Sequence, residues 1–320
     1  MNPDTTTPLE TTVAAAWSRR TGVEPVLPGD RFSDLGGTSM DLEIVLVELR
    51  NALGRDIDAS LFADDPPLHE LASRIEERSR RDFRVRTDTC THLTPGCGDL
   101  PKVFCFAGAG ASAVTFFGLA AHLTGVRDIW AFHAHGFHSR GFPDRTLAAH
   151  GRRHTPRVRE LQPTGPLTLV GHSFGGHVAM EVARRLQAEG REIDRVVLLD
   201  TVLHGAGGSV ANFAGEPADK PALTERLRTH WRVATAGLVP RDVRTQHDVF
   251  WEQAIRVQNR IRLTTVPPRT TVLVTDENER QEEFWRRLDS PPEIRRVPGN
   301  HLDLLTRSEP MASVVDAVTH

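Results

Sequence analysis

The stretch LTLVGHSFGGHVAMEVARRL, residues 167–186, holds the strongest structural signal in this 320-residue chain. It opens with a short apolar run typical of a buried strand and continues with the period of an amphipathic helix. Between the two, GHSFG matches the G-x-S-x-G pattern of a strand–turn–helix that holds a serine on a strained turn, and its glycines remove side chains that would collide there. The stretch therefore predicts Ser173 as a nucleophile. The plain alternative is a glycine-rich turn with an incidental serine.

Strand-like runs alternate with helical segments through residues 101–320, which is typical of a parallel sheet covered by helices. The stretch 203–265 interrupts this alternation with Gly- and Pro-rich segments and amphipathic pieces, and we interpret it as a helical lid. Because parallel strands end at one edge of their sheet, we expect a site at that edge. The strand candidates are 102–108, 128–134, 167–173, 195–200 and 270–276.

A serine nucleophile needs a base and an acid, and in hydrolases with this turn the chain order is serine, acid, histidine. His301 follows a short predicted strand and a Pro-Gly turn, where the base belongs. Two carboxylates could be the acid, because Asp200 and Asp276 end successive strands. Either could instead cap a loop or a helix, and periodicity alone does not separate them.

Two backbone N–H groups should stabilise the oxyanion of such a reaction. Phe174 begins the helix after the serine, so its N–H is in place to donate to developing negative charge. The second donor should come from the small-residue loop FAGAGAS, residues 106–112. Its glycines also suggest a dinucleotide site, but residue 113 is Ala where that fingerprint needs its third glycine. We therefore interpret the loop as part of an oxyanion hole.

Residues 1–80 have a different character. Helical segments at 9–20, from Ser39 onward and at 67–78 predict a small all-helical bundle. This part carries 15 acidic residues against eight arginines, a net charge of −7, which leaves +4 for the rest of a chain whose total is −3. The split favours electrostatic partnering within the chain. Residues 81–100 have no sustained period and contain Pro and Gly, so we interpret them as a linker.

The overall composition excludes several classes. With 39% hydrophobic and 25% charged residues, the chain has the balance of a folded soluble protein. The N-terminus has no basic segment followed by an apolar one, so we expect a cytoplasmic location and no membrane partner. No extended basic footprint points to nucleic acid. Cys90, His92 and Cys97 match no zinc-binding spacing, so we expect no metal.

Ser39 lies in DLGGTSM, residues 34–40, at the start of the second helix. Taken alone, it is an N-cap serine, although a hydroxyl at a helix N-terminus also suits an attached phosphodiester. The motif closely resembles the phosphopantetheine attachment motif of peptidyl and acyl carrier domains. Residues 101–320 resemble the thioesterase domains that end nonribosomal peptide and polyketide synthase chains. Thr38 departs from the His or Asp common in peptidyl carriers, which leaves the type of upstream chain open.

The resemblance implies both fold and residue roles. It implies an α/β-hydrolase at 101–320, with a mostly parallel sheet, helices on both faces and a lid, preceded by a four-helix carrier bundle at 1–80. It also implies that Asp200 rather than Asp276 is the acid. The remaining roles that it implies are a 4'-phosphopantetheine arm on Ser39, Ser173 as nucleophile, His301 as base, and the N–H groups of Phe174 and Ala109 as oxyanion donors.

The implied function is release of an acyl or peptidyl chain, held as a thioester on the chain's own carrier, by hydrolysis or macrocyclisation. Its partners would be upstream synthase modules and a phosphopantetheinyl transferase. One alternative is a serine esterase with an unrelated helical appendage, and another is a non-catalytic carrier and docking module. Because a carrier helix follows directly after MNPDTTTP, we expect a piece of a longer synthase.

Overall fold

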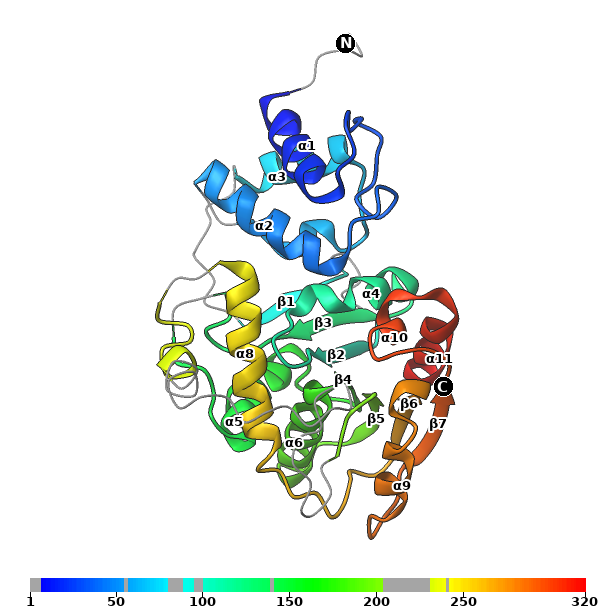
Figure 1. The fold of residues 1–320 in the computed structure, drawn as a ribbon. Helices are drawn as coiled ribbons and strands as arrows, with labels where there is room; N and C mark the ends of the chain where they lie inside the picture. The colour runs from blue at the N-terminus through cyan, green and yellow to red at the C-terminus, as the bar shows by residue number, and fades with distance from the viewer. Residues whose placement is uncertain are drawn as a thin grey trace.

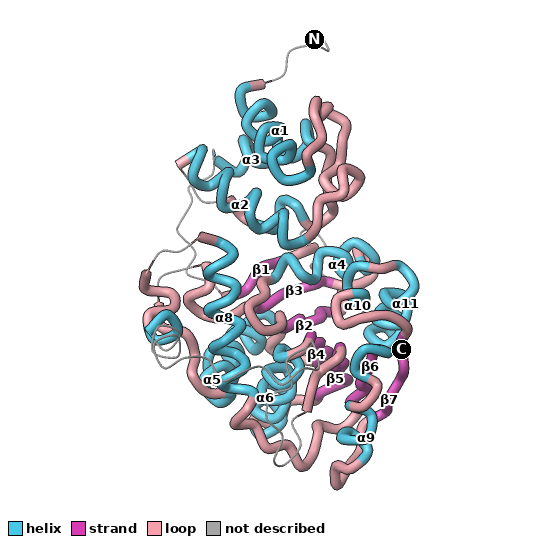
Figure 2. The backbone as a smooth tube through the Cα atoms, viewed as in Figure 1, coloured by secondary structure: helices cyan, strands magenta, loops and turns pink. Residues whose placement is uncertain are grey.

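The structure is a computed structural model that describes residues 7–54, 57–79, 89–94, 100–138, 141–203, 231–239 and 242–320. These residues form a helical N-terminal part and a larger part built around a sheet (Figure 1). Strands run through the middle of the larger part, and helices and loops surround them (Figure 2). The predicted fold class, a mostly parallel sheet with helices preceded by a helical region, is confirmed.

The sheet has the strand order β1-β3-β2-β4-β5-β6-β7. β1 is antiparallel to β3, and the other neighbouring strands are parallel. The five strand candidates from the sequence are present, and the short strand expected before His301 is β7. The strands are β1 (Cys90–His92), β2 (Lys102–Phe106), β3 (Asp128–Phe132), β4 (Leu167–His172), β5 (Ile193–Leu199), β6 (Thr270–Thr275) and β7 (Glu293–Val297).

Two apolar cores lie on the two faces of this sheet. Within β2, Val103 belongs to one core and Phe104 to the other, because successive side chains of a strand point to opposite faces. Burial on both faces explains why the central strands are continuously apolar. Within the larger part, the α-helices that contribute to the first core are α4 (Phe117–Leu123), α10 (Asp303–Thr306) and α11 (Ser308–Thr319), and those of the second are α5 (Leu147–Leu161), α6 (Phe174–Ala188), α8 (Val243–Gln258) and α9 (Gln281–Arg286).

The N-terminal part is a bundle with its own buried centre. Trp17, Leu49 and Leu71 are each at most 1% exposed and come from its three α-helices. The predicted helices are confirmed, and a 3-10 helix stands beside them in the described residues. The elements are α1 (Pro8–Thr21), α2 (Ser39–Leu53), η1 (Ala59–Phe62) and α3 (Leu68–Ser79).

The bundle packs on the larger part through α2. This helix contacts the 3-10 helix η2 (Ala113–Phe116) and the N-terminal half of α8, below it in Figure 1. Glu43 of α2 is only 3% exposed and forms an ion pair with His247 of α8. Buried apolar residues of the two parts form one continuous cluster.

Two segments differ in detail from the sequence interpretation. Strand β1 lies within the stretch interpreted as a linker; it is three residues long and is held by pairing with β3, so no periodic pattern marks it. Much of the expected lid, residues 204–230, lies outside the described residues, as does Cys97. The described remainder includes α8, whose Ala254 and Val257 belong to the second core. None of the described helices is both long and apolar enough to cross a membrane.

Candidate active site

Ser173 occupies the sharp turn between β4 and α6. Its φ of 54° and ψ of −123° form a conformation that residues other than glycine rarely adopt, so the backbone is strained there. The Ser173 N–H donates to the carbonyl of Leu199 at 2.8 Å, which ties the turn to β5. The serine is partly exposed at the carboxyl edge of the sheet, where the site was expected.

The glycines around Ser173 allow this turn to pack closely. A Cβ on Gly175 would lie 2.0 Å from the carbonyl oxygen of Phe106, and one on Gly176 would lie 1.9 Å from Oγ1 of Thr201. Both distances are far below contact distance, so neither position accepts a side chain without movement of its neighbour. The two glycines of HSFGG are therefore required, because α6 approaches β2 and the end of β5 closely.

His301 and Asp200 come together beside this turn. His301 lies in the loop between β7 and α10 (Asp303–Thr306), and Asp200 directly follows β5. Nδ1 of His301 is 2.7 Å from Oδ2 of Asp200, and the two side chains are 14% and 1% exposed. Because an ionised carboxylate only accepts hydrogen bonds, Nδ1 carries the proton. Nε2 of a neutral His301 is then a proton acceptor.

Asp200 is held as a carboxylate by several donors. Oδ1 accepts from the Thr275 N–H at 3.0 Å, and Oδ2 accepts from Oγ1 of Thr275 at 2.9 Å and from Nδ2 of Asn278 at 2.5 Å. Burial by itself raises the pKa of Asp200, but the hydrogen bond and charge of His301, together with Thr275 and Asn278, bring that pKa below its usual value. The side chain is therefore ionised at neutral pH.

The other candidate acid holds the loop of His301 instead. Asp276 begins the 3-10 helix η3 (Asp276–Asn278), and its Oδ2 accepts from the N–H of Gly299 at 3.2 Å. The next residue, Glu277, accepts the N–H of His301 at 2.8 Å. Asp200 thus contacts the ring of His301, whereas Asp276 contacts the backbone of the loop that carries His301.

The small-residue loop after β2 lies against the serine. A Cβ on Gly108 would be 3.3 Å from Cβ of Ser173, so the loop backbone passes close to the turn. Ala109 follows at a partly buried position. Phe174 is the first residue of α6, where a backbone N–H has no acceptor within its own helix. The residue before Ala109 therefore lies close to the serine, and Phe174 directly follows it in the chain.

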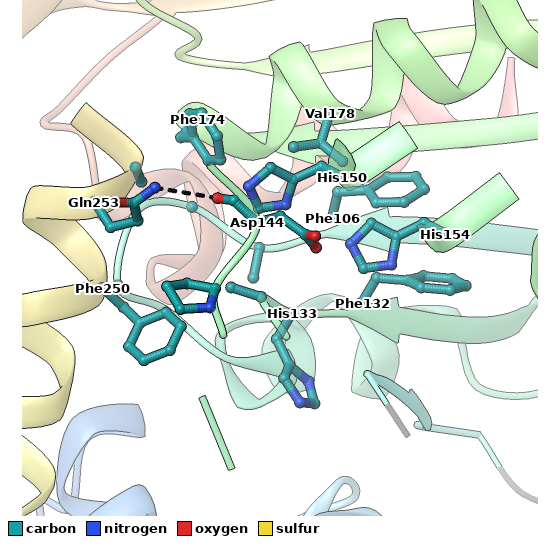
Figure 3. Close-up of a pocket in the computed structure, with 16 residues that line it drawn as sticks. Phe106, Phe132, His133, Asp144, His150, His154, Phe174, Val178, Phe250 and Gln253 are labelled. Carbon is teal, nitrogen blue, oxygen red and sulfur yellow. Dashed lines mark hydrogen bonds between the residues drawn. The ribbon is translucent and has the colours of Figure 1, made fainter. Parts of the chain in front are cut away.

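A small pocket lies behind this loop. His150 and His154 point into it among aromatic side chains that include Phe106, Phe132 and Phe174 (Figure 3). Its volume of about 20 Å³ is room for one water molecule. Burial lowers the pKa of His150 to about 4 and that of His154 well below its usual value, so both are neutral. Among the described residues, no three His, Cys, Asp or Glu side chains are arranged to hold a metal ion.

Ser39 is the first residue of α2. Thr38 is the N-cap; its Oγ1 accepts from the Asp41 N–H at 3.2 Å, and the Asp41 carboxylate accepts from the Thr38 N–H at 3.1 Å. A Cβ on Gly37 would lie 2.4 Å from the ring of Phe32, so the preceding turn closes over that ring. Thr38, the residue before Ser39, is exposed.

Two protein-family models match this chain. A model described as a phosphopantetheine attachment site matches residues 11–75, and one described as a thioesterase domain matches residues 101–238. This chain is a carrier domain followed by a thioesterase domain. Its arrangement is homologous to the termination modules of nonribosomal peptide synthetases. The resemblance inferred from the sequence is thereby confirmed, including a domain of the phosphopantetheine-attachment type.

Individual relatives are much longer than this carrier–thioesterase chain. It is 27% identical over 197 residues to indigoidine synthase of Streptomyces lavendulae, which is 60% of this chain and 15% of that protein. It is 32% identical over 171 residues to a dimodular nonribosomal peptide synthase of Bacillus subtilis (strain 168), which is 53% of this chain and 7% of that protein. The matches therefore span only a small fraction of either relative.

A solved structure has the same fold over both domains. It is a four-domain nonribosomal peptide synthetase in its holo form, bound to AMP and glycine. The match covers 99% of the carrier–thioesterase chain and 26% of that chain, with a TM-score of 0.55 and 19% identity.

The sequence did not single out the residues that hold Asp200 and the loop of His301. Thr275, Asn278 and Glu277 all lie at or just beyond the end of β6, next to β5 in the sheet. The sequence pattern that could have identified them is a polar residue directly after a strand at the carboxyl edge of the sheet. Only Asp276, the first carboxylate after β6, was predicted from that signal.

Proposed function

We propose that this chain releases an acyl or peptidyl group from the arm of its own carrier domain through a covalent intermediate on Ser173. The observation that carries the proposal is the 2.7 Å hydrogen bond between His301 and a buried Asp200, beside a serine on a strained strand–helix turn. A neutral imidazole oriented by a carboxylate is the base that an alcohol nucleophile needs.

In the first step, Nε2 of His301 takes the proton of the Ser173 hydroxyl while Oγ attacks the carbonyl of the acyl thioester. The Nδ1–H bond to Asp200 stabilises the imidazolium that forms. The N–H groups of Phe174 and Ala109 donate to the tetrahedral oxyanion. Collapse breaks the carbon–sulfur bond, and His301 returns its proton to the departing sulfur, which leaves an ester on Ser173.

In the second step, His301 deprotonates a nucleophile that attacks this ester. Water gives a free acid, whereas a hydroxyl or amine of the same acyl chain gives a lactone or a lactam. Ser173 Oγ leaves with the proton held by His301, which restores the resting state. Both outcomes use the same residues, so the choice between them depends on what reaches the ester first.

The start of α2 fits a covalently attached phosphopantetheine on Ser39. The preceding N-cap, Thr38, is exposed, and the free N–H groups and dipole of a helix N-terminus favour the phosphodiester anion. When bound, the group supplies a thiol that holds the acyl chain as a thioester. Attachment also raises the effective concentration of the chain at the thioesterase, so a weak contact between the domains suffices.

We place the carrier domain at 1–80, a linker at 81–100 and the thioesterase domain at 101–320 with its lid near 203–265. The partners in this proposal are a phosphopantetheinyl transferase, which modifies Ser39, and upstream synthase modules, which load the acyl chain. The long relatives, of which only 15% and 7% are matched, support a place at the end of a larger assembly.

The test begins with intact-protein mass spectrometry after incubation with acyl-coenzyme A and a broad phosphopantetheinyl transferase. We expect wild type to gain one acyl-phosphopantetheine mass and then lose the acyl group, Ser173→Ala to retain it, and Ser39→Ala to gain nothing. A serine esterase with an unrelated appendage predicts no mass gain on folded wild type. A non-catalytic carrier predicts the same loss of acyl group from wild type and from Ser173→Ala.

A further inference from the structure

His172 directly precedes Ser173, and the mechanism above gives it no role. It is 3% exposed, and its Nε2 lies 3.1 Å from the backbone carbonyl oxygen of His301. The two imidazole rings are 4.6 Å apart between centroids and inclined by 35°. The last residue of β4 therefore contacts both the backbone and the ring of a residue 129 positions later in the chain.

The hydrogen bond fixes the protonation of His172. A carbonyl oxygen can only accept, so Nε2 of His172 carries the proton and donates. Burial, followed by the charge of His301, lowers the pKa of His172 to about 3. The ring is therefore neutral at neutral pH, and it adds no second positive charge beside His301 when that residue becomes an imidazolium.

Among the contacts of His301 are three hydrogen bonds, each to a different group of this residue. Glu277 accepts its backbone N–H at 2.8 Å, Asp200 accepts its ring N–H at 2.7 Å, and His172 donates to its backbone carbonyl. Of these three partners, only His172 adjoins Ser173 in the chain. Movement of the turn that carries the serine is thereby transmitted to the loop that carries the histidine.

We propose that His172 is a positioning residue for acyl transfer, because its donation to the carbonyl of His301 fixes that loop relative to Ser173. The inference rests on the proposed function, in which Ser173 is the nucleophile and His301 the base. A small misplacement of a base relative to its nucleophile lowers the rate strongly without preventing folding.

The experiment measures how fast a fluorophosphonate modifies Ser173 in the full chain, by intact mass, at several pH values around neutrality. His172→Leu keeps an apolar side chain but removes the donor, whereas His172→Gln keeps an N–H near the position of Nε2. His177→Leu is a matched control, because His177 is 2% exposed and its Nε2 lies 3.1 Å from another backbone carbonyl, that of Val202. Thermal unfolding of each variant reports its stability.

We expect His172→Leu to lower the plateau rate about tenfold, the worth of one buried hydrogen bond. We expect His172→Gln to recover most of that rate and His177→Leu to stay within about threefold of wild type at a comparable loss of stability. Equal rates for wild type and His172→Leu overturn the inference, as does a loss that Gln does not recover or that His177→Leu shares.

Two further variants separate this inference from the function beneath it. Ser173→Ala must abolish labelling, and His301→Ala must slow it far more than His172→Leu does. If both retain the wild-type rate, the proposed function fails and the role of His172 fails with it. If both lose it while His172→Leu does not, the proposed function stands and only the role of His172 is overturned.

Discussion

At the scale of single residues, Asp200 is the side chain of the site that accepts hydrogen bonds from several neighbours. Its two oxygens accept four hydrogen bonds from three residues, and its side chain is 1% exposed. A carboxylate fixed this firmly has one orientation, and the ring of His301 takes its orientation from it. The lowered pKa of Asp200 keeps the charge in place at neutral pH.

Asp200→Asn should lower the rate of Ser173 acylation by about 10³–10⁴-fold, because the amide can donate to Nδ1 and select the wrong tautomer of His301. Asp276→Asn should lower it less than about tenfold, since its carboxylate accepts a hydrogen bond from the backbone of the loop. Burst kinetics with a nitrophenyl ester measure both rates. The assignment of the acid is wrong if the two variants exchange these effects.

The sequence motifs predicted the serine and the histidine of this group, but the residues alone did not choose between the acids, and the preference for Asp200 came from the family resemblance. Asp200 and Asp276 end adjacent strands, so both satisfy the rule that places the site at the carboxyl edge. The two aspartates differ in the backbone conformation of the loops that they begin. Asp200 has a positive φ of 48°, whereas Asp276 starts a 3-10 helix. Such loop geometry depends on tertiary contacts that no local pattern encodes.

Gly175→Ala should destabilise the chain, because its Cβ would lie 2.0 Å from a backbone oxygen that cannot rotate away. We expect a loss of about 2 kcal/mol or more, as for an overpacked core position. Gly29→Ala is the control, since a Cβ there would meet no heavy atom within 4 Å. It should change the free energy of unfolding by less than about 0.5 kcal/mol, as measured by denaturant unfolding midpoints. A Gly175→Ala chain as stable as wild type contradicts the close approach of α6 to β2.

At the scale of elements, segments with a clear apolar pattern were predictable, and the three-residue strand β1 was not. The helices of the bundle were found from apolar periodicity, and the central strands were found from short apolar runs, because the strands are buried on both faces. Strand β1 has three residues, and its position depends on pairing with β3. The segment that forms α8 was expected in a lid, because its amphipathic pattern does not reveal which surface it covers.

Thr38→Ala should remove the capping box of α2 and cost about 1 kcal/mol. Because the cap fixes the backbone at Ser39, we also expect slower modification by the transferase. Thr7→Ala removes the equivalent capping box of α1 and should cost a similar amount without slowing modification. Intact mass against time, together with unfolding curves, separates the two effects. Equal modification rates for the two variants would refute a role of the cap at Ser39.

At the scale of the whole molecule, the contact between the domains contains a buried pair of a carboxyl and an imidazole side chain. The acidic N-terminal part and the basic remainder predicted that the two parts would meet, but 15 acidic side chains gave no way to select Glu43. The structure places it between α2 and α8, against His247. A buried carboxylate needs such a partner, so this pair marks where docking is most sensitive.

Glu43→Gln should slow release from the attached carrier at least about tenfold, because it removes one charge of a buried pair. Hydrolysis of a free nitrophenyl ester by the same chain should not change, since that reaction does not use the carrier domain. Glu48→Gln is the control on α2, because Glu48 pairs with Arg19 inside the bundle at 3.0 Å. A parallel fall in both activities would show a general defect rather than weakened docking.

The continuous apolar cluster that joins the bundle to η2 also affects how long the carrier domain stays bound to the thioesterase domain. A carrier that serves upstream enzymes has to divide its time between them and the thioesterase. While it is bound to the thioesterase, it is not loaded. Under the proposed function, the strength of this contact sets the ratio between early release and completed product. A weaker contact between the domains would give longer acyl or peptidyl chains more slowly, and a stronger contact would give shorter chains sooner.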